Sequence, residues 1–520
     1  MKERIIILGA GVMQGPAIKI AKDLGLETFV LDADPAAPCV HLADHFECID
    51  LKDKTGIEDF ARSLKEQGGL AGIMTAGTDF SASVAWTAEK LGLPGISYET
   101  ALNASDKERM RSCFKAAGVP SPQFTILNHV PTNEFSLPFT FPVVVKPVDN
   151  MGSRGCRTVL SANDLADAVE DALRFSRSGR AIVEEYMDGP EFSIDAIVFQ
   201  GEITLCGLAD RHIFFPPYFI EMGHTMPTNL DVKNQEAILE VFKQGVKALG
   251  IKNGAAKGDM KLTSRGPMIG EIAARLSGGY MSGWTYPYSS GVEPARGAIL
   301  AALGKKPDQL EATKQWTSAE RAFISIPGKV TSILGIDEAK KISHVKDVFL
   351  RIEAGSRVMF PENNVSKCGN IISLAPNRED AIHSAESAAQ NILINLESPN
   401  EETEKFLQTW TAFPPNAFSI DEDTLNRLNN IPDGNLIPQT NKILMVYPFP
   451  EFTAQNPHDY MGRNISQIFS AITDLSGYIL DFPNNAELQN GTFLGREFWR
   501  YLIRGSYQGA LYYLDTRSIF

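Results

Sequence analysis

Patterns that bind structural metal or form disulfide frameworks are missing from this chain of 520 residues. Its six cysteines are scattered without CxxC pairs, and its eight histidines form no HExxH-like cluster. Zinc sites and disulfide scaffolds both depend on such spacings. We therefore expect no structural zinc, and we expect reduced thiols in a cytoplasmic protein.

Long apolar runs and basic stripes are missing as well. No apolar stretch approaches the length of a membrane span, and the first residues form a strand-like run rather than a signal segment. The net charge is −14, and no stretch interleaves basic with aromatic residues. These features argue against membranes and nucleic acids as partners. The partners that we expect are therefore small-molecule substrates. The sequence does not decide whether the chain forms a homodimer.

The composition is that of an ordinary globular protein, with 43% hydrophobic and 22% charged residues. A chain of this length predicts two to four domains. Apolar runs alternate with helical periodicity over residues 4–93, which indicates a parallel α/β sheet. We interpret residues 397–404 as a polar linker. Residues 405–520 lack clear periodicity, and we expect their aromatic side chains in a core.

A glycine-rich turn follows the first apolar run. Gly9, Gly11 and Gly15 have the spacing G-x-G-x-x-x-G, and the acidic Asp32 follows about twenty residues later. A dinucleotide fingerprint has the spacing G-x-G-x-x-G with an acidic residue at that distance. NAD binding by a dehydrogenase is one hypothesis; the other is a plain strand-to-helix turn whose helix amides face a ligand pocket. The second is favoured, because an isolated glycine motif is a weak signal.

The most specific pattern is a hairpin predicted over residues 254–275, with its turn at residues 264–266. Counting outward from that turn pairs Asp259 with Glu271. Side chains alternate between the two faces of a strand. The polar face then carries six residues: Lys257, Asp259, Lys261, Glu271, Ala273 and Arg275.

Two carboxylates directly opposite each other repel and destabilise a sheet. A divalent cation bound between Asp259 and Glu271 would remove that cost, and Mg²⁺ commonly uses one or two carboxylates together with substrate phosphates. Alternatively, Lys257 and Lys261 neutralise the pair on a solvated face. We favour the metal, because Arg275 adds an anion-binding group to the same face.

Groups that could hold phosphate occur earlier in the chain. Lys146 ends a buried strand, and the small residues of 150–155 follow as a loop. The backbone amides of such a loop can approach phosphate oxygens, and the loop can close as a lid. The alternatives are a solvated lysine and a plain hairpin turn.

Lys107 lies in the first turn of a helix predicted over residues 103–118, with Ser105 and Glu108 as its capping box. A cation at that position opposes the helix dipole, which suggests another use, such as phosphate binding. A surface lysine is the alternative.

A strand end at Tyr186 and Met187 could contact the edge of an adenine through its backbone. A carboxylate nearby, from Glu184, Glu185 or Glu191, could accept hydrogen bonds from ribose hydroxyls. A solvated acidic turn would have the same composition.

Taken in order, these segments resemble the ATP-grasp superfamily. The resemblance rests on the stretches SDKERMR, VVVKP, MGSRG, VEEYMDGPEFSID and GAAKGDMKLTSRGPMIGEIAARLSGG. It covers residues 1–396 and is strongest to carboxylate–amine ligases of the L-amino-acid ligase type. The carbamoyl-phosphate-synthase and phosphoribosylglycinamide-synthetase branches are also similar. Residues 328–390 resemble the C-terminal part of the ligase-type members.

The resemblance implies an ATP-grasp fold of α/β and α+β class. It assigns residues 1–104 to a Rossmann-like domain, 105–190 to a small lid subdomain, 191–396 to a large subdomain with the Mg²⁺ and ATP site, and 397–520 to an unassigned C-terminal extension. It further implies that the first domain does not bind NAD. The glycine turn, with Gly11 and Gln14, would instead help to form a substrate pocket.

The resemblance also implies roles for single residues in binding ATP and Mg²⁺ (or Mn²⁺). Phosphates would be held by Lys107 and Lys146, and the metal by Asp259 and Glu271. The remaining nucleotide contacts would come from the lid residues Ser153 and Gly155, from Glu184, Tyr186 and Met187 at adenine, and from Glu191 at ribose.

The implied enzyme is an ATP-dependent ligase that forms an amide or peptide bond, or a thioester, through an acyl-phosphate, releasing ADP and phosphate. Arg275 and Lys146 would be catalytic, and Arg211 and His224 would contact an amino-acid-like substrate. Asp259 replaces the usual glutamate and Ala273 replaces a metal-binding asparagine of many members. The alternatives are a carboxylase or carbamoyl-phosphate-synthase-like enzyme acting on bicarbonate, and a catalytically silent ATP-binding regulator.

Overall fold

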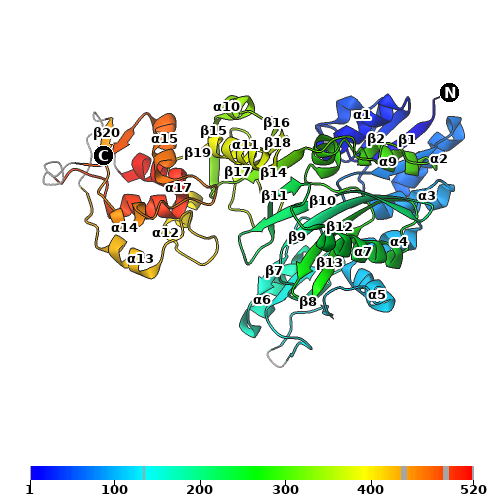
Figure 1. Ribbon diagram of the computed structural model, residues 1–520, viewed down its shortest axis with the longest axis horizontal. Coiled ribbons are helices and arrows are strands. Elements are labelled where there is room, and N and C mark those ends of the chain that lie inside the picture. The colour runs from blue at the N-terminus through cyan, green and yellow to red at the C-terminus, as the bar shows by residue number, and fades with distance from the viewer. Residues whose placement is uncertain (1, 133–134, 435–441, 484–490, 518–520) are drawn as a thin grey trace. The chain divides into compact units, whose positions relative to one another are not determined.

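The computed structural model describes residues 2–132, 135–434, 442–483 and 491–517. The chain divides into two compact units (Figure 1). Unit 1 comprises Met1–Glu320 and Leu374–Ala381, and unit 2 comprises Arg321–Ser373 and Ile382–Phe520. The division falls within three elements: β14 (Thr317–Phe323), β18 (Gly369–Ala375) and α11 (Arg378–Asn391). Most of residues 321–396 therefore group with the C-terminal region.

A four-stranded parallel sheet opens unit 1, in the order β3-β2-β1-β4. Its strands and helices are β1 (Arg4–Leu8), α1 (Gly15–Asp23), β2 (Glu27–Asp32), β3 (His45–Cys48), α2 (Lys54–Gly68), β4 (Gly72–Thr75) and α3 (Ser81–Leu91). Strand β1 is buried on both faces, because Ile5 packs with Ile18 of α1 and Ile6 packs with Ile57 of α2. The predicted parallel α/β sheet is confirmed.

Two helices follow where the sequence predicted one. Helix α4 (Tyr98–Ser105) ends and α5 (Lys107–Ala117) begins at Asp106. The Asp106 backbone is extended, and its carboxylate accepts a hydrogen bond from the Arg109 amide at 3.1 Å. Asp106 is therefore the N-cap of α5, and the predicted capping box of Ser105 and Glu108 is wrong.

The second sheet of unit 1 has the order β5-β8-β6-β7, with helix α6 (Leu165–Phe175) packed on it. Its strands are β5 (Phe124–Leu127), β6 (Val143–Pro147), β7 (Arg157–Val159) and β8 (Ala181–Glu185). All three pairings are antiparallel. The sheet places Lys146 near the end of β6, next to the glycine-bearing loop that leads to β7.

The third sheet carries the polar hairpin, and its unit 1 strands run in the order β13-β12-β9-β10-β11. The elements are β9 (Glu191–Phe199), β10 (Glu202–Phe214), β11 (Ile220–Met226), α7 (Val232–Leu249), β12 (Gly254–Thr263), β13 (Gly266–Ala273), α8 (Tyr286–Ser289) and α9 (Pro294–Ala302).

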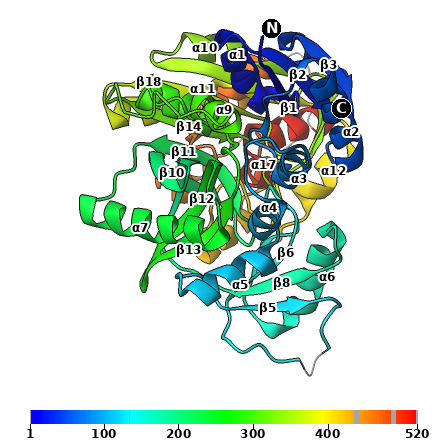
Figure 2. The same cartoon turned by 90° about the vertical axis from the view of Figure 1, so that its right-hand side faces the viewer.

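Different helices pack on the two faces of this sheet. Helix α7 packs on one face over β12 and β13 (Figure 2), where Phe242 belongs to one apolar cluster with Ile194 and Met260. On the opposite face, Ile197 and Ala255 pack with α9. The rest of that face carries charged side chains, because the positions that alternate with the α7-facing residues are polar in both β9 and β12.

Unit 2 combines short sheets with helices. Strand β15 (Gly328–Leu334) pairs with β17 (Arg357–Val358) and β19 (Leu393–Leu396), β16 (Val345–Leu350) pairs with β18, and β20 (Ile443–Met445) runs parallel to β21 (Ile479–Asp481). The helices are α10 (Ile336–Lys341), α12 (Glu401–Gln408), α13 (Glu422–Asn429), α14 (Pro450–Thr453), α15 (Ile465–Ser476) and α17 (Arg496–Arg517).

Trp499 and Phe498 of α17 are completely buried in a core that also contains Leu393 of β19. The expectation that the C-terminal aromatic side chains form a core is therefore confirmed. The linker predicted at residues 397–404 is wrong: Asn400 caps α12 by accepting hydrogen bonds from two backbone amides, and the helix begins at Glu401. Among the described residues, no helix is long and apolar enough to cross a bilayer.

Candidate active site

The β12–β13 hairpin places Asp259 directly opposite Glu271, as predicted. The register arises differently from the prediction. Thr263 pairs with Gly266, so the turn is one residue shorter, and a bulge at Gly270 supplies the missing residue. A shift by one residue moves a side chain to the other face of a strand. The bulge therefore brings Glu271 to the face that carries Asp259.

The polar face of the hairpin is largely buried rather than solvated. The Asp259 side chain is 16% exposed; it contacts the Lys257 ammonium, and its Oδ1 lies 3.5 Å from an Arg211 nitrogen. Burial acts to raise the pKa of the Asp259 carboxyl, but Arg211 and Lys257 outweigh burial and hold that pKa below its usual value. Of the two lysines considered from the sequence, Lys257 therefore neutralises Asp259, whereas Lys261 pairs with Glu191 instead.

Glu271 faces Lys107 of α5, with 3.6 Å between the ammonium and the carboxylate. Lys107 is 5% exposed and donates a hydrogen bond to the Asn150 carbonyl at 3.0 Å. Burial opposes its charge, yet Glu271 and Asp79 raise the pKa of the Lys107 ammonium. Lys107 is thus a buried cation between the carboxylate pair and the start of the 150–155 loop, and not a surface lysine.

Lys146 forms an ion pair with Glu184 of β8 at 2.7 Å. Glu184 is 2% exposed and also accepts a hydrogen bond from the Arg111 Nε at 2.8 Å. Burial favours the neutral acid, but Arg111 and Lys146 lower the pKa of the Glu184 carboxyl below its usual value. Glu184 therefore lies beneath Lys146 as its counter-ion.

The end of β8 presents the other residues expected at adenine and ribose. Tyr186 is 37% exposed, and the Lys261 ammonium lies 5.3 Å from the centre of its ring. Glu191 accepts from Arg211 at 3.0 Å and lies 3.2 Å from the Lys261 ammonium. Met187 is partly buried. An aromatic ring, a thioether and a paired carboxylate thus line this end of the strand.

The loop between β6 and β7 is built from residues in left-handed backbone conformations. Gly152, Ser153 and Gly155 have φ values of 71°, 60° and 65°. A Cβ on Gly155 would lie 2.9 Å from the Phe175 ring, so the loop packs against α6 only because that position is glycine.

Arg275 follows β13 and lies beside Asp79, which follows β4. The Arg275 Nε is 3.9 Å from the Asp79 carboxylate, and the guanidinium donates to the Leu276 carbonyl at 3.0 Å. Nε is buried and has no hydrogen-bond partner among the described residues. An unsatisfied buried donor of this kind is suited to an anionic ligand group.

Arg211 and His224 lie in the same buried network. Arg211 bridges Glu191 and Glu221, with 2.9 Å to the latter. The His224 Nδ1 is 3.0 Å from Glu320, and its Nε2 is 3.7 Å from Glu221. Both predicted substrate residues are therefore connected to Asp259 through Arg211.

The glycine turn after β1 is filled by a side chain of the chain itself. The Gln14 side chain accepts from the Gly11 amide at 2.9 Å and donates to the Ala76 carbonyl. A Cβ on Gly9 would lie 2.9 Å from Gln14, so the glycine makes room for this side chain. Asp32 accepts from the Ala10 amide at 2.8 Å, which occupies one of its oxygens with the turn itself. Gly11 and Gln14 thus hold the turn and are not part of the ion-pair network.

Asp259 and Glu271 are a pair and not a complete metal cage. Within the described residues, no group of three or more histidine, cysteine, aspartate or glutamate side chains is placed to hold a metal ion. Mg²⁺ commonly takes one or two carboxylates and completes its shell with water and phosphate oxygens. The donor set fits Mg²⁺ that is bound together with a nucleotide, and Ala273 offers no further donor.

Five contributors to this network were not predicted: Asp79, Arg111, Glu184 as a counter-ion, Glu221 and Glu320. Lys107 and Arg111 are four residues apart on one helix, so a shared face could have been predicted from the sequence. Asp79 follows a parallel strand at its carboxyl end, where ligands of α/β sheets bind.

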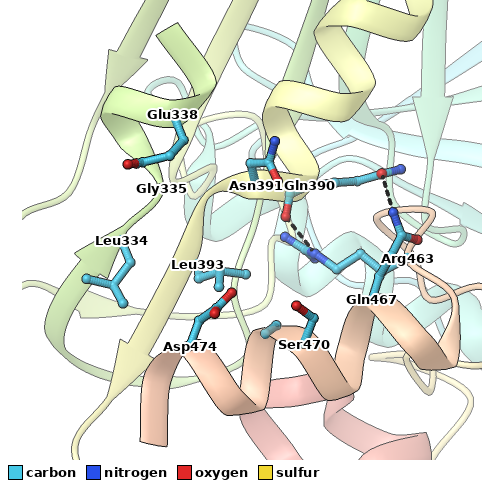
Figure 3. A pocket seen from close by; sticks show the side chains of 11 residues that line it. Leu334, Gly335, Glu338, Gln390, Asn391, Leu393, Arg463, Gln467, Ser470 and Asp474 are labelled. Atoms are coloured by element: carbon cyan, nitrogen blue, oxygen red, sulfur yellow. Dashed lines mark hydrogen bonds between the residues drawn. The ribbon is translucent and has the colours of Figure 1, made fainter. Parts of the chain in front are cut away.

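A cavity of about 510 Å³ lies within unit 2 (Figure 3) and contains none of the predicted site residues. Arg463 donates to the Gln390 and Ile392 carbonyls at the end of α11, and Glu338 and Asp474 lie at the cavity wall. Arg463 therefore satisfies carbonyls at the C-terminal end of that helix.

Comparisons with known proteins find two matching domains in the chain. A model of the ATP-grasp domain matches residues 139–283, and a model of L-amino acid ligase C-terminal domain 2 matches residues 322–397. An uncharacterized protein of Sinorhizobium fredii is 24% identical over 383 residues, covering 72% of this chain and 79% of that protein.

Alanine–anticapsin ligase of Bacillus subtilis is 29% identical over 239 residues, which are 41% of this chain and 50% of the ligase. The solved structure of an L-amino acid ligase from Bacillus licheniformis has a TM-score of 0.67 at 23% identity, covering 76% of this chain and 99% of that one. The fold is the ATP-grasp fold.

Proposed function

We infer that this chain, a member of the ATP-grasp superfamily, is an ATP-dependent carboxylate–amine ligase. The observation that carries the proposal is the pairing of Asp259 with Glu271 in the same ion-pair region as two lysines, the buried Lys107 and the partly buried Lys146. Carboxylates suit Mg²⁺, and the lysines suit phosphates. The ATP-grasp and L-amino acid ligase domains support the same reaction class.

The proposed reaction has two steps. A carboxylate oxygen of the acid substrate attacks the γ-phosphorus of ATP, and the bond between that phosphorus and the bridging oxygen breaks, which gives an acyl-phosphate and ADP. The nitrogen of an amine then attacks the acyl carbon, the bond from carbon to the phosphate oxygen breaks, and the amine loses a proton. The products are an amide, phosphate and ADP.

The residues of the chain would act mainly by positioning and by neutralising charge. Lys107 and Lys146 would hold the phosphates, and Asp259 and Glu271 would hold Mg²⁺, which neutralises charge on the phosphate oxygens when bound. Arg275 has a buried Nε without a partner among the described residues and would face the acyl-phosphate.

The loop with Ser153 and Gly155 would close over the phosphates and exclude water. At the adenine end, Tyr186, Met187 and Glu191 remain candidates, whereas Glu184 would act through Lys146.

An amino-acid substrate is supported by the buried network around Arg211 and His224. Its carboxylates, Glu221 and Glu320, suit an ammonium group, and the arginine suits a carboxylate. A second function, an ATP-binding regulator without turnover, is favoured by the alanine at position 273, where no third metal ligand is available.

The test is phosphate release from Mg-ATP with hydroxylamine present, across a panel of amino acids, other carboxylic acids and bicarbonate. Hydroxamate formed with one class of acid would establish acyl-phosphate chemistry and identify the acid. Binding of ATP without turnover on any acid would favour the regulator. Absence of ATP binding would contradict both.

A further inference from the structure

Arg111 occupies an unusual position in unit 1. Its side chain is completely buried, although it carries a charge. Burying a charge is costly unless it is paired and hydrogen-bonded. Its guanidinium has two contacts of different kinds, one to the Glu184 carboxylate and one to a backbone carbonyl.

The first contact leads to the phosphate side of the site. The Arg111 Nε donates to one oxygen of Glu184 at 2.8 Å, and the other oxygen of Glu184 is 2.7 Å from the Lys146 ammonium. Glu184 therefore has one oxygen for each cation. Removing Arg111 would leave its oxygen without that partner and free the carboxylate to turn toward Lys146.

The second contact leads to the carboxylate pair. An Arg111 nitrogen donates to the Gly270 carbonyl at 2.6 Å. Gly270 is the bulged residue whose insertion sets Glu271 opposite Asp259. A hydrogen bond to the bulge carbonyl holds the peptide group that precedes Glu271, and so holds the direction in which its side chain leaves the strand.

The neighbouring residues of α5 reinforce this connection. Lys107, one turn earlier, faces the Glu271 carboxylate, and the Met110 sulfur accepts from the Ile272 amide at 3.4 Å. Three consecutive residues of β13 are thus contacted by one face of α5. The remaining Arg111 nitrogen is buried without a hydrogen-bond partner among the described residues.

We propose that Arg111 is a positioning residue that couples phosphate binding at Lys146 to metal binding at the Asp259–Glu271 pair. This inference rests on the proposed function. A planar guanidinium can span both contacts in one fixed geometry, which a lysine ammonium does not reproduce. The structural alternative is a buried ion pair that stabilises unit 1 without linking the two ligands.

The experiment compares the affinity for a non-hydrolysable ATP analogue in EDTA with the affinity in Mg²⁺, by titration calorimetry on the full chain. The coupling between metal and nucleotide is measured by one ratio: the dissociation constant in EDTA divided by the dissociation constant in Mg²⁺. We expect Arg111→Lys to lower this ratio about tenfold while changing the dissociation constant in EDTA much less. A purely structural role predicts a lower unfolding temperature with an unchanged ratio, which would overturn the inference.

Arg109→Lys is the matched control, because Arg109 lies on the same helix and pairs with the exposed Glu99. It should leave both affinities unchanged. Gly270→Ala is the second variant: its Cβ would lie 3.1 Å from the Asp259 carbonyl oxygen and disturb the bulge without touching Arg111. It should also lower the ratio, and where Arg111→Lys does not fold, an unchanged ratio in this variant would overturn the inference.

The two levels of proposal fail in different ways. If the unaltered chain does not bind the analogue, or binds it equally well with and without Mg²⁺, the proposed site itself is wrong. If the unaltered chain shows the coupling and both variants retain it, only the role of Arg111 is wrong.

Discussion

Asp259 lies opposite Glu271 because one residue, Gly270, leaves the regular ladder between their strands. Without that bulge, Glu271 would point toward α7 and its apolar contacts. Two acidic side chains are thus placed together by backbone geometry, at a point where Lys107 of α5 pairs with Glu271 and Lys257 of β12 pairs with Asp259.

Neutralising either carboxylate should remove the metal-dependent reaction. We expect Glu271→Gln and Asp259→Asn each to lower Mg²⁺-dependent hydroxamate formation by about a hundredfold or more, because the amides are weaker ligands for a hard cation. The measurement is the rate across a Mg²⁺ titration. Glu402→Gln serves as control, since Glu402 forms an exposed ion pair with Arg357 in unit 2. A variant that keeps the full rate would exclude its residue as a ligand.

A methyl group added to the glycine turn should destabilise the protein, and the turn should not bind NADH. Gly9 has φ of 100°, and an added Cβ would approach Gln14 to 2.9 Å. We expect Gly9→Ala to lower the free energy of unfolding by about 1–3 kcal/mol, measured by urea denaturation. Gly25→Ala, with φ of 79° and no neighbour within 4 Å, separates backbone strain from crowding. Quenching or enhancement of NADH fluorescence by the unaltered chain would revive the dehydrogenase hypothesis.

Asp195 should make stability depend on pH. Burial raises the pKa of its carboxyl from 3.8 to about 6, despite hydrogen bonds from Ser277. The native state then holds the proton more tightly, so Asp195 favours folding below the unfolded pKa, and that contribution is lost as pH rises through about 6. Asp195→Asn should therefore gain stability relative to the unaltered chain between about pH 4 and pH 7, by up to about 3 kcal/mol.

Urea unfolding at several pH values, in EDTA and without nucleotide, measures this difference. The direction is opposite to that for the carboxylates whose pKa is lowered, Glu184 among them, which stabilise the fold above their unfolded pKa and lose that effect in acid. A difference between the two chains that does not vary with pH would contradict the assignment to Asp195.

Shortening the chain after Ser398 should separate the two units functionally. We expect ATP binding to remain, because Lys107, Lys146, Asp259 and Glu271 all belong to unit 1. The removed residues supply most of the core that surrounds Leu393, so the remainder of unit 2 should expose apolar surface and bind a hydrophobic dye. Loss of ATP binding in a shortened chain that keeps its circular dichroism would refute this expectation.

The sequence predicted the elements that depend on local pattern. The strand–helix alternation, the β12–β13 hairpin and the buried strand ending near Lys146 follow from periodicity, and Asp259 and Glu271 follow from the hairpin. The bulge was not predicted, because the turn is one residue shorter than expected and the insertion of Gly270 compensates for that residue. Asp259 therefore still pairs with Glu271.

Contacts between distant segments could not be predicted in this way. Arg111 lies 159 residues from Gly270 and 73 from Glu184, and no period or spacing connects them. The break at Asp106 was missed for a local reason: an aspartate in an extended conformation restarts a helix that the apolar pattern alone continues.

The role of Gln14 in the glycine turn bears on how glycine spacing is interpreted in other sequences. A glycine-rich turn indicates only that some group comes close to the backbone; it does not indicate whether a ligand or the protein itself supplies that group. Here the group is the side-chain amide of Gln14, which is hydrogen-bonded to the Gly11 amide and to the Ala76 carbonyl at the end of the neighbouring strand. A search for cofactor sites by glycine spacing would therefore gain accuracy by asking which side chain three residues onward is long enough to satisfy the turn from within.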